Sequence, residues 1–167
     1  MVYPLSSVSA HVSASPNHQT GRETSFETRG NVALAGAFGY ELDLTKLSQA
    51  EKALVREQVA RSHEWSPVVQ DGDFYRLINP FEDANRCAWE SVSADQTKAI
   101  VTFVVTRCKI HMTTNLRLRG LDANRKYQET ASGHIYSGDT LMNAGLNLNG
   151  QYPDGFSMVL CFTAVEE

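Results

Sequence analysis

The sequence predicts an α/β part followed by an all-β part. Strand-like and helix-like segments alternate in the first third of the chain, whereas short β-rich runs separated by turn residues follow from Asp71 onward. Near residues 66–73 the period of the apolar residues changes from about 3.6, typical of helices, to about 2, typical of strands. We therefore expect two domains, residues 1–66 and residues 67–167.

Residues 1–46 predict a strand–helix–strand arrangement. Apolar residues alternate over residues 8–13 and again over residues 38–44, so both segments are expected to be strands. Thr24 precedes Glu27 by three residues, which is the spacing of a capping box, and a helix is therefore expected over residues 25–36.

A second helix is expected over residues 48–65. Ser48 and Glu51 have the spacing of a capping box, and Glu57 stands four residues before Arg61, an order that favours a helical ion pair. Pro67 is expected to end this helix, because proline lacks a backbone N–H.

The remaining residues predict an antiparallel β-sandwich. Residues 74–78 read as one strand, and residues 87–92 and 99–106 are expected to pair across the turn between them. Alternating apolar residues over 156–163 predict a further strand. Trp89 is open to two interpretations, a core residue or an exposed platform for a sugar ring.

Composition excludes several function classes. The net charge is −4 and the charged residues are scattered, which argues against a nucleic-acid partner. No apolar run is long enough to span a membrane, and no signal peptide is recognisable. Cys87, Cys108 and Cys161 are odd in number and form no C-x-x-C pair, so neither a zinc site nor a disulfide framework is predicted. A cytoplasmic location is expected.

Three segments resemble the C-terminal third of melibiase-type α-galactosidases, glycoside hydrolase family 36. They are HVSASPNHQTGR from His11, ETRGNVALAGAFGYELDLTKLS from Glu27, and YSGDTLMNAGL from Tyr136. The resemblance implies a retaining enzyme that removes terminal α-galactosyl groups from melibiose- or raffinose-type oligosaccharides. It also implies a (β/α)8 barrel followed by an antiparallel β domain. This chain would hold the last two βα units of that barrel and the C-terminal β-sandwich.

The same resemblance implies that both catalytic carboxylates lie outside this chain. The nucleophile of the family is an aspartate in a Lys-Trp-Asp motif, whereas Trp65 and Trp89 stand in other contexts. The acid/base aspartate precedes a Tyr-Pro pair, and Tyr3-Pro4 stands at the start of this sequence. We therefore expect a fragment with no catalytic residue and no activity of its own; whether this chain by itself is an enzyme stays open.

Candidate substrate-binding residues follow from the expected barrel, because active sites of such barrels lie at the C-terminal ends of the strands. The candidates lie at the end of the first strand and in the loop after it: His11, Ser13, Asn17 and His18. Their structural alternative is to order the loop by binding its backbone groups.

Two other arrangements of polar residues are interpreted as structural. His11 and His18 lack a third ligand at a recognised spacing, so no metal and no cofactor are expected. Glu41 and Asp43 are expected on one face of a strand, where they cannot flank a glycosidic bond as the two carboxyl groups of a glycosidase must.

Three functions remain open from the sequence. The first is a portion of an α-galactosidase, with an α-galactoside oligosaccharide as the partner of the intact enzyme. The second is a stand-alone carbohydrate-binding or interaction module. The third is a sister activity of the same family, such as galactosyl transfer to sucrose or cleavage of α-N-acetylgalactosamine. Unpaired strand edges in residues 1–65 also lead us to expect a homo-oligomer.

Overall fold

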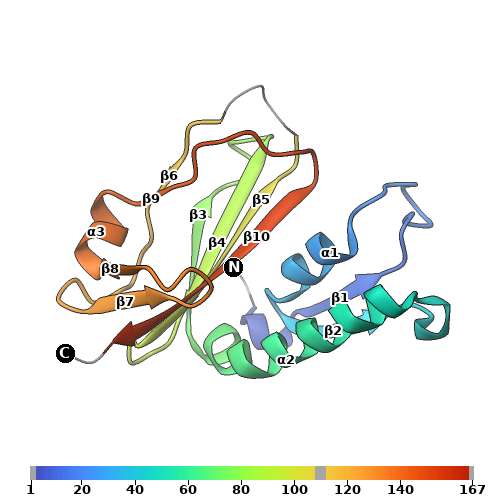
Figure 1. Cartoon of the computed structure of the whole chain (residues 1–167), viewed down its shortest axis with the longest axis horizontal. Helices are drawn as coiled ribbons and strands as arrows, with labels where there is room; N and C mark the ends of the chain where they lie inside the picture. Colours follow the sequence, from blue (N-terminus) through green and yellow to red (C-terminus); the bar gives the residue numbers. More distant parts are fainter. Residues whose placement is uncertain (1–2, 108–111, 166–167) are drawn as a thin grey trace.

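The computed structural model describes residues 3–107 and 112–165; Cys108 lies outside the described residues. Figure 1 shows a helical part beside a twisted antiparallel sheet. The helical part comprises η1 (Leu5–Ser7), β1 (Ser9–Ser13), α1 (Phe26–Ala33), β2 (Ala37–Glu41), η2 (Leu44–Lys46) and α2 (Gln49–Asp71). The expected combination of an α/β part and an antiparallel β part is confirmed.

Strands β1 and β2 form a two-stranded parallel sheet in which Ser9 pairs with Ala37 and Ser13 with Glu41. One face of this sheet is covered by α1 and α2. A hydrophobic cluster joins the four elements, with Val12, Phe26 and Ala33 buried at its centre and Tyr40 and Leu54 packed around them. Apolar residues at every second strand position therefore face the helices.

The boundaries of α1 and β2 differ from the expected ones. Ser25, not Thr24, caps α1, because its side chain accepts a hydrogen bond from the Thr28 backbone N–H (3.0 Å). The helix ends at Ala33, before Gly36, where a Cβ would lie 2.5 Å from the Val8 carbonyl oxygen. Only glycine permits this approach of the chain to the start of β1, and the chain turns there into β2.

Helix α2 confirms its predicted start and corrects its predicted end. Ser48 and Glu51 form the capping box, with both reciprocal hydrogen bonds present. Pro67, however, lies inside the helix, which continues to Asp71. Val68 and Val69 beyond the proline are buried against the large sheet, and this burial offsets the hydrogen bond that the proline removes.

The β part consists of β3 (Asp73–Ile78), β4 (Arg86–Val92), β5 (Lys98–Val105), β6 (Asn115–Leu116), β7 (Lys126–Glu129), β8 (Ile135–Ser137), α3 (Gly138–Asn143), β9 (Leu146–Asn147) and β10 (Phe156–Val165). Six strands form one sheet in the order β3-β4-β5-β10-β7-β8, and β6 pairs with β9. The predicted pairing of residues 87–92 with residues 99–106 is confirmed, because β4 and β5 are antiparallel neighbours.

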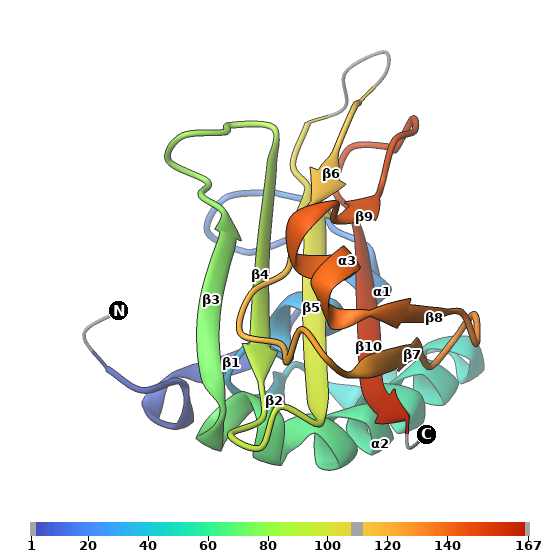
Figure 2. The same ribbon diagram turned by 90° about the vertical axis from the view of Figure 1, so that its left-hand side faces the viewer.

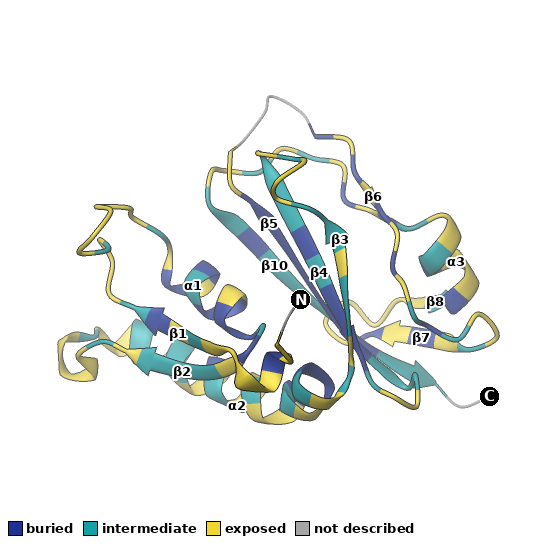
Figure 3. Cartoon of the chain, turned by 180° about the vertical axis from the view of Figure 1, so that it is seen from behind, coloured by how far each residue is buried: buried dark blue, intermediate teal, exposed yellow. Residues whose placement is uncertain are grey.

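Both faces of the six-stranded sheet are covered. On one face lie β6, β9 and α3, as Figure 2 shows. These elements supply leucines to the main core around Phe103 and Tyr127. On the other face, Trp65 and Val68 of α2 pack on Ile100. Most of β5 is coloured as buried in Figure 3, whereas β10 beside it is mostly intermediate. Strand β5 is buried on both faces, which explains its nearly continuous apolar sequence.

A buried polar network fixes α1 on β10. The Asn31 side-chain amide donates to Ser157 Oγ (3.0 Å), the Ser157 hydroxyl donates to Thr28 Oγ1 (2.9 Å), and the Thr28 hydroxyl donates to the Gly155 carbonyl oxygen (2.8 Å). All three side chains are buried. Each of these three donors has an acceptor, so this buried network joins α1 to the sheet at a defined position.

Candidate functional site

The β1–β2 sheet has one face that the described helices leave uncovered. The helix-covered face carries Val12 and Tyr40, so the alternate residues point to the opposite face. These are His11 and Ser13 of β1, with Gly39 and Glu41 of β2 beside them in the register. The C-terminal ends of the two parallel strands, Ser13 and Glu41, lie side by side.

A contact between two polar side chains joins the two strands on this face. His11 Nε2 lies 2.7 Å from Glu41 Oε2, and the side chains are 44% and 74% exposed. His11 lies opposite Gly39, so its contact with Glu41 runs diagonally toward the C-terminal end of β2. This contact therefore holds the Glu41 carboxylate near the C-terminal ends of the two strands.

Asp43 does not share a strand with Glu41, contrary to the sequence prediction. Strand β2 ends at Glu41, and Asp43 caps η2 by accepting hydrogen bonds from the backbone N–H (3.0 Å) and the hydroxyl (2.6 Å) of Thr45. These hydrogen bonds lower the pKa of Asp43. The strand ends before Asp43 because the Asp43 side chain binds the Thr45 backbone N–H and so favours a helical turn over an extended strand.

The loop between β1 and α1 is organised by Asn17. Its side-chain oxygen accepts hydrogen bonds from the backbone N–H groups of Gln19 (3.1 Å) and Thr20 (3.0 Å), and its own backbone N–H donates to the Arg22 carbonyl oxygen (2.9 Å). The oxygen of the Asn17 side chain therefore orders the loop, as the structural alternative for this residue predicts.

Arg29 fastens both ends of the same loop, a role that sequence reasoning missed. Its guanidinium donates to the carbonyl oxygen of Ser13 at the end of β1 and to that of Thr24 before α1, and it lies over the Phe26 ring at 4.9 Å. Partial burial lowers the pKa of Arg29, and the nearby Glu51 raises it. A single arginine on a helix gives no sequence signal for this contact.

The structure brings together some of the predicted site residues. Ser13 and Asn17 line a hollow of about 310 Å³ with Arg22 and Arg29. His11 lines a larger hollow of about 920 Å³ that extends from α1 to Asp154 and Gly155 before β10. His18 is exposed in the loop and lines neither hollow. Of the four candidates, the structure therefore brings Ser13 and Asn17 into one hollow, and His11 and His18 do not line it.

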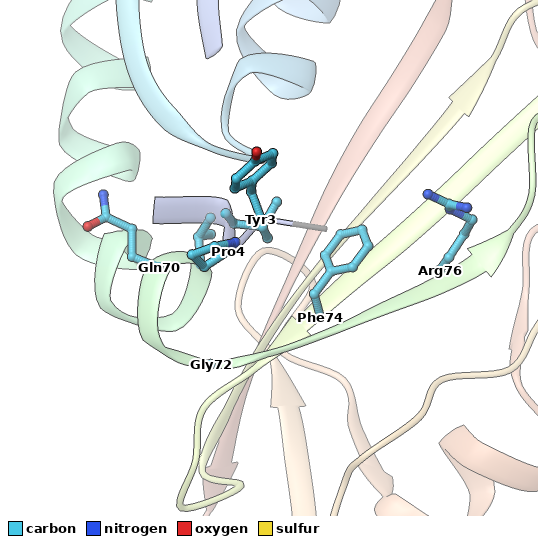
Figure 4. A pocket seen from close by; sticks show the side chains of 8 residues that line it. Tyr3, Pro4, Gln70, Gly72, Phe74 and Arg76 are labelled. Atoms are coloured by element: carbon cyan, nitrogen blue, oxygen red, sulfur yellow. The ribbon is translucent and has the colours of Figure 1, made fainter. Parts of the chain in front are cut away.

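A separate hollow of about 470 Å³ lies where the N-terminal segment meets the end of α2 and the start of β3. Figure 4 shows Tyr3, Phe74 and Arg76 around it, with Gln70 on α2 pointing away. None of the predicted site residues lines this hollow.

Metal and membrane sites are not found in the described part of the chain. Residues 3–107 and 112–165 contain no group of three His, Cys, Asp or Glu side chains that could hold a metal ion. No described helix is both long and apolar enough to cross a membrane. Trp89 is half-buried on β4, so neither of its two interpretations is decided.

Comparison with known protein families accounts for both parts of the chain. The melibiase family model matches residues 1–72, and the model of the glycosyl hydrolase family 36 C-terminal domain matches residues 86–162. The chain belongs to glycoside hydrolase family 36. The segment ranges agree with the α/β part and the antiparallel β part of the structure.

Family 36 relatives contain this chain as a part of a longer protein. The alpha-galactosidase AgaA of Geobacillus stearothermophilus is 46% identical over 168 residues, which is all of this chain and 23% of the relative. Alpha-galactosidase 1 of Pediococcus pentosaceus is 45% identical with the same coverage. The chain thus spans about a quarter of the length of these relatives.

Solved family 36 structures have the same fold over this region. A variant of the Geobacillus stearothermophilus AgaA in complex with raffinose superposes with a TM-score of 0.94 at 46% identity, covering 98% of this chain and 23% of that one. A second variant, in complex with stachyose, gives 0.93 at 47% identity with 98% and 23% coverage.

Proposed function

We propose that this chain is a C-terminal portion of a retaining α-galactosidase that hydrolyses terminal α-galactosyl residues of melibiose- and raffinose-type oligosaccharides. The observation that carries the proposal is the match of 98% of this chain to an α-galactosidase solved with raffinose. A stand-alone binding module is not favoured, because the relatives contain this segment within a longer α-galactosidase.

In this proposal β1 and β2 are the last two strands of a (β/α)8 barrel. Their parallel pairing, with both helices on one face, is the arrangement of neighbouring barrel strands. The uncovered face with His11 and Glu41 then lines the barrel interior. The proposed domain division, residues 1–66 and 67–167, falls within α2, and residues 67–167 form the C-terminal β-sandwich.

The chemistry would be carried by two carboxyl groups outside this chain. One attacks the anomeric carbon, and the other protonates the leaving oxygen and later activates water. Within this chain, we propose that one wall of the sugar pocket is lined by residues in the C-terminal half of β1 and in the loop after it: His11, Ser13, Asn17 and His18. The isolated chain is accordingly proposed to be inactive.

Two further parts of the proposal concern location and assembly. A reducing cytoplasm is supported by Cys87 and Cys161, which are free thiols. Self-association of the isolated chain is supported by the two strands of the β1–β2 sheet, each of which has one edge without a strand partner in the described residues.

A chimeric enzyme tests the proposed function. Residues 1–167 replace the matching quarter of the Geobacillus stearothermophilus relative, and raffinose hydrolysis is measured. We expect kcat/KM within about tenfold of the unmodified relative, because a 46% identical segment should rebuild the same barrel.

Two controls define the result. The relative without this quarter and the isolated chain are both expected to be inactive, because the first lacks strands of its barrel and the second lacks both carboxylates. A chimera that melts as cooperatively as the relative but does not hydrolyse raffinose would refute the proposed function.

A further inference from the structure

We propose that Glu41 supplies a carboxylate to the floor of the galactosyl pocket and that His11 is the residue that positions it. The inference rests on the proposed function, and it adds a binding residue that the sequence had assigned a structural role. It is carried by the place of Glu41 at the C-terminal end of β2 and by its contact with His11.

The place of Glu41 follows from the register of the parallel sheet. Glu41 is the last residue of β2 and pairs with Ser13, the last residue of β1. Its side chain lies on the face opposite α1 and α2, since Tyr40 on its N-terminal side packs toward the helices. In a barrel, the last inward-facing residue of a strand borders the site where substrates bind.

The contact with His11 occupies only half of the carboxylate. Glu41 Oε2 meets His11 Nε2 at 2.7 Å, whereas Oε1 has no hydrogen-bond partner among the described residues. A carboxylate oxygen can only accept hydrogen bonds, and sugar hydroxyl groups are donors. One oxygen is in contact with the imidazole, and the other is an acceptor to which a hydroxyl group of the sugar can donate.

The test uses the chimeric enzyme described above, with raffinose as the substrate. Glu41→Gln keeps the shape of the side chain and removes its charge, and we expect kcat/KM to fall roughly 10- to 100-fold, mainly through a higher KM. Asp43→Asn is the matched control: asparagine caps a helical turn as well as aspartate, so kcat/KM should stay within about twofold.

Variants of His11 test whether this residue positions Glu41 or only stabilises the fold. We expect His11→Ala to lower kcat/KM about tenfold and His11→Gln to restore most of it, because an amide N–H can take the place of the Nε2–H donor. In the His11→Ala background, Glu41→Gln should have a reduced effect, as coupled residues do. Melting temperatures should change little in the four variants with a single substitution.

The outcomes distinguish the inference from the function on which it rests. An inactive chimera with the unchanged chain would overturn both. An active chimera in which Glu41→Gln and Asp43→Asn have equal effects, or in which His11→Gln does not differ from His11→Ala, would overturn the inference and leave the proposed function standing.

Discussion

Raising the pH from 5 to 8 is expected to destabilise this chain, and Glu90→Gln is expected to remove most of that loss. Glu90 lies on β4 with no exposed surface. Its Oε2 accepts a hydrogen bond from the Arg119 backbone N–H (2.8 Å), but its Oε1 is buried without a partner. Burial disfavours the ionised form and raises the pKa of Glu90 to about 8.

The sign follows from proton binding. Between the ordinary glutamate pKa of 4.5 and about 8, the folded chain holds a proton on Glu90 that the unfolded chain has released. Stability contributed by this group is therefore present below pH 4.5 and decreases as the pH rises, by about 1.4 kcal/mol per pH unit. Glutamine stays neutral throughout, so the Glu90→Gln variant should lack this slope and be more stable than the parent at pH 8.

Urea unfolding at pH 5, 6, 7 and 8 measures this slope, with Glu129→Gln as the control. Glu129 is also buried, and its burial alone would raise its pKa. Hydrogen bonds from the backbone N–H groups of Ala131 (3.0 Å) and Ser132 (2.7 Å), and from the Ser132 side chain, prevail and lower the pKa of Glu129 instead. Glu129 thus stabilises the fold above pH 4.5, and Glu129→Gln should be destabilising there. Parallel curves for parent and Glu90→Gln would contradict the account.

Trp65→Ala is expected to cost about 3–5 kcal/mol of unfolding free energy. Trp65 of α2 is 3% exposed and belongs to the cluster that joins the helical part to the large sheet. The Lys98 ammonium lies 5.6 Å from the centre of its ring, which adds a cation–π contact. Its removal leaves a cavity between the two parts, so α2 should loosen from the sheet.

Chemical unfolding followed by circular dichroism measures this cost. Phe81→Ala is a suitable control, because Phe81 is 90% exposed in the connection between β3 and β4 and its removal should change stability by less than about 0.5 kcal/mol. A loss below about 1 kcal/mol for Trp65→Ala would mean that the contact between α2 and the sheet does not stabilise the fold.

Local signals predicted much of the fold. The Ser48–Glu51 capping box placed the start of α2 because both partners lie within one turn. Pro67 misled the prediction of its end, because burial of Val68 and Val69 is a tertiary effect. The short helix α3 was not predicted from the sequence; Ser137 caps it, and Leu141 anchors it in the core.

The candidate site was less predictable. His11 and Ser13 could be proposed from the sequence because they lie in the C-terminal half of a strand whose alternation is visible there. The contact between His11 and Glu41 joins residues thirty positions apart and depends on the register of β1 against β2, which no local pattern determines. The loop clamp by Arg29 likewise depends on how α1 packs against β1.

Hydrogen exchange of β1 tests the central proposal, that β1 and β2 are neighbouring strands of a larger barrel, most directly. In the chimeric enzyme, another strand should pair with β1, so amides of residues 9–13 should exchange at least roughly tenfold more slowly than in the isolated chain diluted until it is monomeric. Residues 98–105, which are buried on both faces of the large sheet, serve as the internal reference and should change little. Equal exchange of residues 9–13 in the two proteins would contradict the proposal.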